Sequence, residues 1–163
     1  AVYFEIIRQK TASLISSCCG VGTASVSDDK DLIERMRQFG EKLGIAFQIK
    51  DDLFDFASSA KTGKPSGIDI KEQKMTLPLI YTLKQCSKKD RSFIINVVKR
   101  HNRNKPKVAR VMELVRQHGG LEYAEDKMRA HYQEALEILH KFPENDARTS
   151  LSQLCAYVIE RNK

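Results

Sequence analysis

The chain has 163 residues, 41% of them hydrophobic, and its 28 Lys and Arg against 21 Asp and Glu give a net charge of +7. This length predicts one domain that can bury a core, which excludes a disordered chain. The sequence holds no run of about 18 apolar residues, which excludes a spanning helix, and its first residues lack the order of a secretory signal. We therefore expect a cytoplasmic protein.

Apolar residues recur at helical spacing along most of the chain, and Pro and Gly fall between the periodic segments. This pattern predicts an all-α fold. A first helix is already under way at Val2, and its apolar stripe comprises Phe4, Ile7, Ala12, Leu14 and Ile15. Because no capping residue precedes this stripe, we interpret the chain as a fragment that starts inside a helix.

A second long helix is expected after the sequence SVSDD, where Ser27 or an adjacent Asp can cap it, and it should extend to about Phe56. Its predicted buried stripe is Leu32, Met36, Phe39, Leu43 and Phe47. Gly40 and Gly44 lie one turn apart in it, and each costs a helix about 1 kcal/mol relative to Ala. We therefore expect another backbone to pack closely against this pair.

The rest of the chain is predicted to form shorter helices. Residues 58–67 are rich in turn formers, and a helix should begin near Thr76 with Pro78 in its first turn. Further helices are expected at about residues 91–100, 107–118, 121–141 and 147–159. The cysteines show no metal-ligand spacing and are expected to be reduced and mostly buried; they are Cys18, Cys19, Cys86 and Cys155.

The densest chemical signal is an acidic segment within FQIKDDLFDF. Its polar residues stand at i, i+3, i+4 and i+7, which places them on one helix face; they are Gln48, Asp51, Asp52 and Asp55. Three like charges on one stripe repel each other, so a cation should offset them. Carboxylate oxygens together with water and phosphate suit Mg²⁺. The alternative is a solvated acidic face held by nearby lysines and arginines.

A basic, glycine-containing segment follows directly. It carries Lys61, Lys64, Lys71 and Lys74, a composition able to neutralise phosphate oxygens, although the Walker spacing is absent. A flexible basic surface loop is the alternative for this segment taken alone. Because a metal-bound diphosphate needs both signs of charge, the acidic and basic segments together favour a magnesium-diphosphate site.

Three motifs resemble the trans-type polyprenyl diphosphate synthases, in the order found in that family: QKTASLISSCC, FQIKDDLFD and GKPSGIDIKEQKMTLPLIYTL. The resemblance implies a helical bundle of the isoprenoid synthase type. Residues 1–163 would form the C-terminal part of a single all-helical domain. The N-terminal half, with a first aspartate-rich motif, would lie upstream of Ala1.

The resemblance also implies roles for individual residues. Asp51 would bind Mg²⁺ directly, whereas Asp52 and Asp55 would act mainly through metal-bound water. Gln48 would order the same side of the cavity, and Asp69 stands where the family favours an acid. The allylic diphosphate would be contacted by Lys10, Thr11, Lys64 and Lys74. Without the resemblance, Lys10 and Thr11 are interpreted as a polar patch at a helix bend.

The implied reaction is ionisation of an allylic diphosphate, 1'-4 coupling to isopentenyl diphosphate and proton loss, giving a longer all-trans polyprenyl diphosphate of medium or long chain. We expect a homodimer, and an isolated segment that is inactive or nearly so. A non-catalytic regulatory subunit of a heteromeric synthase is the alternative. A nucleic-acid binder that uses the basic run Lys99–Lys107 ranks last, because no aromatic residues interleave with it.

Overall fold

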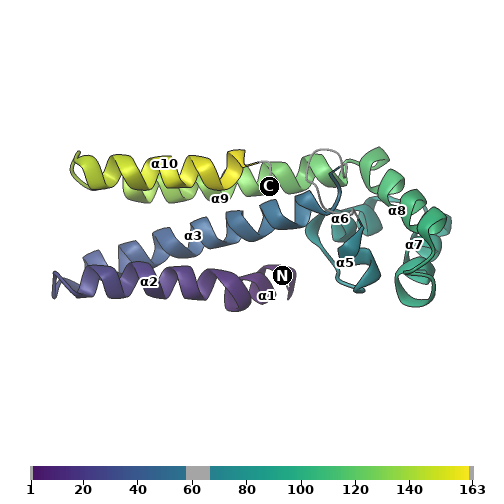
Figure 1. Ribbon diagram of the computed structural model, residues 1–163, viewed down its shortest axis with the longest axis horizontal. Coiled ribbons are helices and arrows are strands. Elements are labelled where there is room, and N and C mark those ends of the chain that lie inside the picture. The colour runs from purple at the N-terminus through teal and green to yellow at the C-terminus, as the bar shows by residue number, and fades with distance from the viewer. Residues whose placement is uncertain (1, 58–66, 162–163) are drawn as a thin grey trace. The chain divides into compact units, whose positions relative to one another are not determined.

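The computed structural model describes residues 2–57 and 67–161, and these ranges contain helices and no strand (Figure 1). The elements in chain order are α1 (Val2–Ile7), the π-helix η1 (Arg8–Ala12), α2 (Ser13–Ala24), α3 (Lys30–Phe54), α5 (Ile68–Lys71), α6 (Leu77–Gln85), α7 (Lys88–Arg100), α8 (Lys105–Gln117), α9 (Gly120–Leu139) and α10 (Asp146–Glu160). The predicted all-α class is therefore confirmed.

Two compact units make up this fold, and each is considered by itself. The first unit comprises residues 2–50 and 127–161, and the second comprises residues 51–57 and 67–126 of the described chain. The first contains α1, η1, α2, α10 and most of α3 and α9 (Figure 1). The second contains α5 to α8.

Local side-chain caps set several of the helix starts. Asp29 Oδ1 accepts from the backbone N–H groups of Asp31 and Leu32 at 2.9 and 3.2 Å, which confirms that an acidic residue of the SVSDD sequence caps α3. Asn104 caps α8 in the same way and accepts from Lys107 N at 3.1 Å. Helix α6 begins at Leu77 with a proline in its first turn, as expected.

The glycine pair of α3 packs against the backbone of the preceding helical segments. A Cβ added at Gly40 would lie 2.8 Å from Ile15 O, and one at Gly44 would lie 2.6 Å from Ala12 Cα. Both distances are shorter than any ordinary carbon contact, so only glycine allows this approach. The prediction of close helix packing at this pair is confirmed.

The first apolar stripe is only partly buried, contrary to the expectation. Ile7 and Ala12 are buried, but Leu14 is 69% exposed. The π-helix Arg8–Ala12 lies between them and inserts an extra residue into the helical register. Because one residue corresponds to about 100° of rotation, the side chains after η1 are turned away from the face that α-helical spacing predicts.

The core of the second unit is formed by residues of α5, α6, α7 and α8. Its buried members include Ile70, Leu79, Ile94, Val97, Val111 and Val115.

The cysteines are less buried than predicted, because only Cys155 is buried and Cys18 is exposed. Within the described ranges, no helix combines the length and the apolar character needed to cross a membrane.

His131 is a partly buried titratable group of the first unit. Its ring contacts Phe4 at a centroid distance of 5.8 Å, and its Nδ1 atom is buried with no hydrogen-bond partner. Glu134 Oε2 lies 3.7 Å from Nδ1 but is already paired with Lys42 Nζ at 2.6 Å. Burial lowers the pKa of His131, an effect opposed by the charge of Glu134 and reinforced by that of Lys42.

We expect this histidine to make folding stability fall in mild acid. Because its pKa is lowered on folding, the unfolded chain binds the proton more readily, and stability is lost as the pH falls below the ordinary value of 6.5. His131→Phe keeps a ring against Phe4 and removes the titration. Melting temperatures of both proteins between pH 7.5 and 5.5 provide the measurement, and parallel curves would contradict the prediction.

Candidate functional site

The acidic segment lies at the C-terminal end of α3. Asp51 is half-buried in the last turn of this helix, one turn after Gln48. Asp52 is 6% exposed, and its Oδ2 accepts from Leu77 N at 3.4 Å. Leu77 is the first residue of α6, whose preceding residue Thr76 makes no side-chain cap. Asp52 therefore provides the N-terminal end of α6 with a carboxylate from elsewhere in the chain.

Asp55 lies beyond the end of α3, and its expected place on the helical stripe is wrong. The helix ends at Phe54, not near Phe56. Asp55 Oδ1 accepts from Ile68 N at 2.7 Å and Oδ2 accepts from Asp69 N at 3.2 Å. These are the first amides of α5, so Asp55 caps that helix.

The electrostatic environment of Asp55 is unfavourable to its negative charge. Burial raises the pKa of this carboxyl group, and the nearby charge of Asp69 raises it further, against the lowering effects of the two amide hydrogen bonds and of the Lys71 charge. A cation bound between these two carboxylates and an anionic ligand would reduce the repulsion between Asp55 and Asp69.

Lys74 forms two ion pairs with acidic residues of this segment. Its Nζ lies 3.4 Å from Asp69 Oδ1 and 2.5 Å from Glu72 Oε2. The hydrogen bond with Glu72 raises the pKa of this lysine, so it remains cationic at neutral pH. Lys64, the other lysine expected to contact diphosphate from this segment, falls outside the described residues.

Thr11 and Gln48 come together in the first unit, a contact that the sequence did not predict. Thr11 Oγ1 donates to Gln48 Oε1 at 2.8 Å, joining η1 to α3. Lys10 precedes Thr11 on the π-helix and is exposed. π-Helical turns are frequent at functional sites. Lys10 and Thr11 therefore both lie on a π-helical turn.

The predicted site residues thus form two groups, one in each unit. Thr11 bonds to Gln48 in the first, whereas the second brings Asp52, Asp55, Asp69 and Lys74 onto two adjoining helix termini. Across residues 2–57 and 67–161, no group of three or more acidic, His or Cys side chains is already arranged around a cation position.

One contact to this segment was missed from the sequence. Arg116 Nη2 donates to Phe56 O at 2.7 Å and holds the turn that follows the acidic segment. Sixty positions separate the two residues. No local pattern connects them, so no sequence signal could have found this contact.

The donor set suits a hard divalent cation. Asp51, Asp52 and Asp55 supply carboxylate oxygens, and Mg²⁺ is commonly held by one or two such groups while phosphate and water fill the remaining positions. Asp51 is half-buried in the last turn of α3, and the resemblance assigns it the direct-ligand role. This assignment stays a prediction.

Comparison with known proteins identifies extended similarity. Residues 1–115 match the family model described as Polyprenyl synthetase. The chain is 35% identical over 160 residues to a short chain isoprenyl diphosphate synthase of Methanothermobacter thermautotrophicus, which covers 98% of this chain and 49% of the relative.

Solved structures show the same similarity. A decaprenyl diphosphate synthase from Rhodobacter capsulatus matches with a TM-score of 0.91 and 33% identity over 99% of this chain and 50% of its own. A polyprenyl synthase from Caulobacter crescentus CB15, complexed with calcium and isoprenyl diphosphate, matches with a TM-score of 0.90 and 31% identity, again over 99% and 50%. The chain spans about half the length of the relatives that it matches.

Proposed function

This chain belongs to the polyprenyl synthetase family, and we propose from that premise that it is the C-terminal part of a trans-polyprenyl diphosphate synthase. The complete enzyme condenses an allylic diphosphate with isopentenyl diphosphate and releases a longer polyprenyl diphosphate. The observation that carries the proposal is the acidic end of α3, where Asp52 and Asp55 are bonded to helix termini and Lys74 stands beside Asp69. Opposite charges there suit a metal-bound diphosphate.

We infer that the resident metal is Mg²⁺, held by Asp51 directly and by Asp52 and Asp55 through water. When bound, the ion stabilises negative charge on the leaving diphosphate. The calcium and isoprenyl diphosphate bound by the Caulobacter relative support a divalent cation at such sites.

The lysines and Thr11 would act on the departing group. Cleavage of the allylic C–O bond leaves an electron pair and negative charge on the diphosphate, which Lys74, Lys10 and Lys64 are proposed to neutralise. Thr11 is proposed to contact the diphosphate; its hydroxyl proton, which is donated to Gln48 Oε1 here, would turn to a diphosphate oxygen when the ligand binds. Preplaced charges of this kind lower the barrier without reorganisation during the reaction.

We propose that the complete protein is a homodimer in the cytoplasm. In it, residues 1–163 are joined to an N-terminal half that carries the remaining metal ligands. Without that half, the diphosphate would face water on one side and the electrostatic stabilisation would weaken. The segment alone is therefore proposed to be inactive or nearly so.

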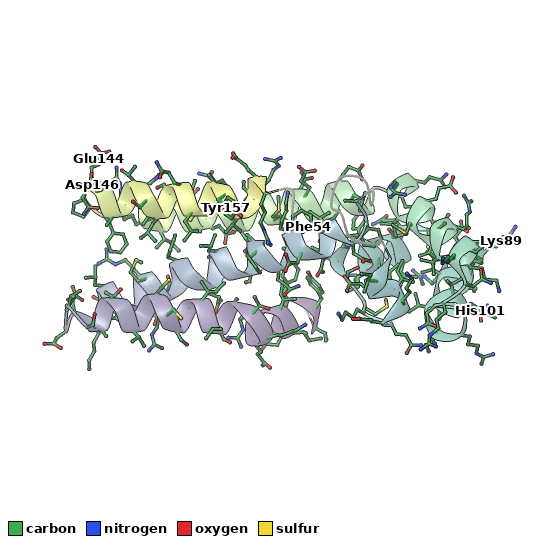
Figure 2. The ribbon with its side chains drawn as sticks, in the orientation of Figure 1. Phe54, Lys89, His101, Glu144, Asp146 and Tyr157 are labelled. Carbon is green, nitrogen blue, oxygen red and sulfur yellow. The ribbon has the colours of Figure 1, made fainter. Side chains whose placement is uncertain are left out.

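Lys74→Ala in the full-length protein tests the role of the second unit. Removing this cation should weaken Mg²⁺-dependent binding of inorganic pyrophosphate about tenfold, the cost of losing a charge-assisted hydrogen bond. Titration calorimetry measures the affinity. The matched control is Lys89→Ala, since Lys89 is an exposed lysine near the start of α7 (Figure 2) and should leave binding unchanged. If unaltered protein binds no pyrophosphate with Mg²⁺, the proposal fails and a non-catalytic subunit is favoured.

A further inference from the structure

The segment that carries Lys74 follows a very short helix. Helix α5 has four residues, Ile68–Lys71, so its carbonyl groups need partners outside the helix. It closes with two backbone bonds, from Gln73 N to Ile70 O at 3.1 Å and from Lys74 N to Asp69 O at 2.8 Å. This is the Schellman arrangement, which requires a left-handed residue at the Gln73 position.

Gln73 occupies that left-handed conformation at a cost. Its φ is +59°, and it is the only non-glycine residue with positive φ in the described chain. Glycine is the usual residue there, and other side chains cost about 1–2 kcal/mol. Such a conformation persists only where the surroundings hold it. An external support for this turn is therefore to be expected.

Two side-chain hydrogen bonds provide the support, and both connect to the corner between α7 and α8. Gln73 Nε2 donates to Lys99 O at 3.1 Å, and Asn102 Nδ2 donates to Lys71 O at 2.6 Å. The acceptor of each bond is a backbone carbonyl in the last turn of a helix, α7 for the first bond and α5 for the second. His101, which marks the end of α7 in Figure 2, immediately precedes Asn102.

We propose that Asn102 is a positioning residue for diphosphate binding, which it serves by fixing the α5 end so that Lys74 and Asp69 keep their relative placement. The inference rests on the proposed function, because it takes Lys74 to be a diphosphate contact. The Gln73 side chain makes the second hydrogen bond that supports this turn. Without these two hydrogen bonds, the strained turn relaxes and the Lys74 ammonium group samples positions away from the ligand.

The test compares Asn102→Ala with Asn104→Ala in the full-length protein. Asn104 stands two residues away and its side chain caps α8 by accepting from Lys107 N, so its loss is a matched structural perturbation. We expect Asn102→Ala to raise the dissociation constant of Mg²⁺–pyrophosphate about fivefold, the equivalent of one net hydrogen bond. The KM for the allylic diphosphate should rise with it while kcat changes less. Asn104→Ala should lower the melting temperature and leave both constants unchanged.

A double variant separates this inference from the proposed function. If Asn102 acts through Lys74, adding Asn102→Ala to Lys74→Ala should cause little further loss of pyrophosphate affinity. Additive losses, or equal affinities of the Asn102 and Asn104 variants, would overturn the positioning role and leave the proposed function intact. An unaltered affinity in Lys74→Ala alone would overturn the assignment of Lys74 itself.

Discussion

Asp51→Ala in the full-length protein is expected to abolish most prenyl transfer while leaving the fold intact. If this carboxylate is the direct magnesium ligand, its removal leaves the leaving diphosphate without its main stabiliser, and kcat/KM should fall about 100-fold or more. The side chain is half-buried, so the free energy of unfolding should change by no more than about 1 kcal/mol. Steady-state kinetics at several Mg²⁺ concentrations and urea unfolding are the two measurements.

Asp52→Ala supplies the comparison for stability, because the same substitution is made at the adjacent residue. Asp52 is buried and accepts from Leu77 N, and its loss leaves a backbone donor unsatisfied at the start of α6. We expect the free energy of unfolding to fall by about 1–3 kcal/mol. A stable Asp51 variant that keeps wild-type activity would refute the direct-ligand role, and an Asp52 variant of unchanged stability would refute the capping role.

The contrast between these neighbours marks the limit of what the sequence could predict. Spacing alone placed four residues on one helix face and did not distinguish their roles; they are Gln48, Asp51, Asp52 and Asp55. In the structure Asp55 accepts from Ile68 N, 13 residues later, and Asp52 accepts from Leu77 N, 25 residues later. Both amides lie at the start of a helix. A helical wheel contains no information on such contacts, because they depend on how the chain returns to the end of α3.

Local signals were sufficient where the deciding interaction is local. The Asp29 cap, the proline start of α6 and the all-α class follow from residues within one or two turns of each other. The π-turn at Arg8–Ala12 was not predicted, although the buried residues Ile7 and Ala12 stand five positions apart, one more than an α-helical turn allows on one face. Leu14, two residues after Ala12, is exposed.

The glycine pair of α3 is an exception, since the low helix propensity of two glycines predicted a contact with a segment distant in sequence. Gly44→Ala should lower the free energy of unfolding by about 2–3 kcal/mol, the usual cost of overpacking, even though alanine favours a helix by about 1 kcal/mol. The new Cβ would lie 2.6 Å from Ala12 Cα and 2.8 Å from Ala12 Cβ. Backbone atoms cannot rotate away, so η1 and α3 must separate.

The control is Gly22→Ala, because a Cβ at Gly22 in α2 would have nothing within 4 Å. There alanine brings only its helix propensity, and stability should rise by up to about 1 kcal/mol. Urea unfolding of the two variants should therefore shift in opposite directions from wild type. Separation at Gly44 would also stretch the bond from Thr11 to Gln48, since Thr11 adjoins Ala12. If Gly44→Ala is as stable as Gly22→Ala, the close approach of η1 and α3 does not exist in solution.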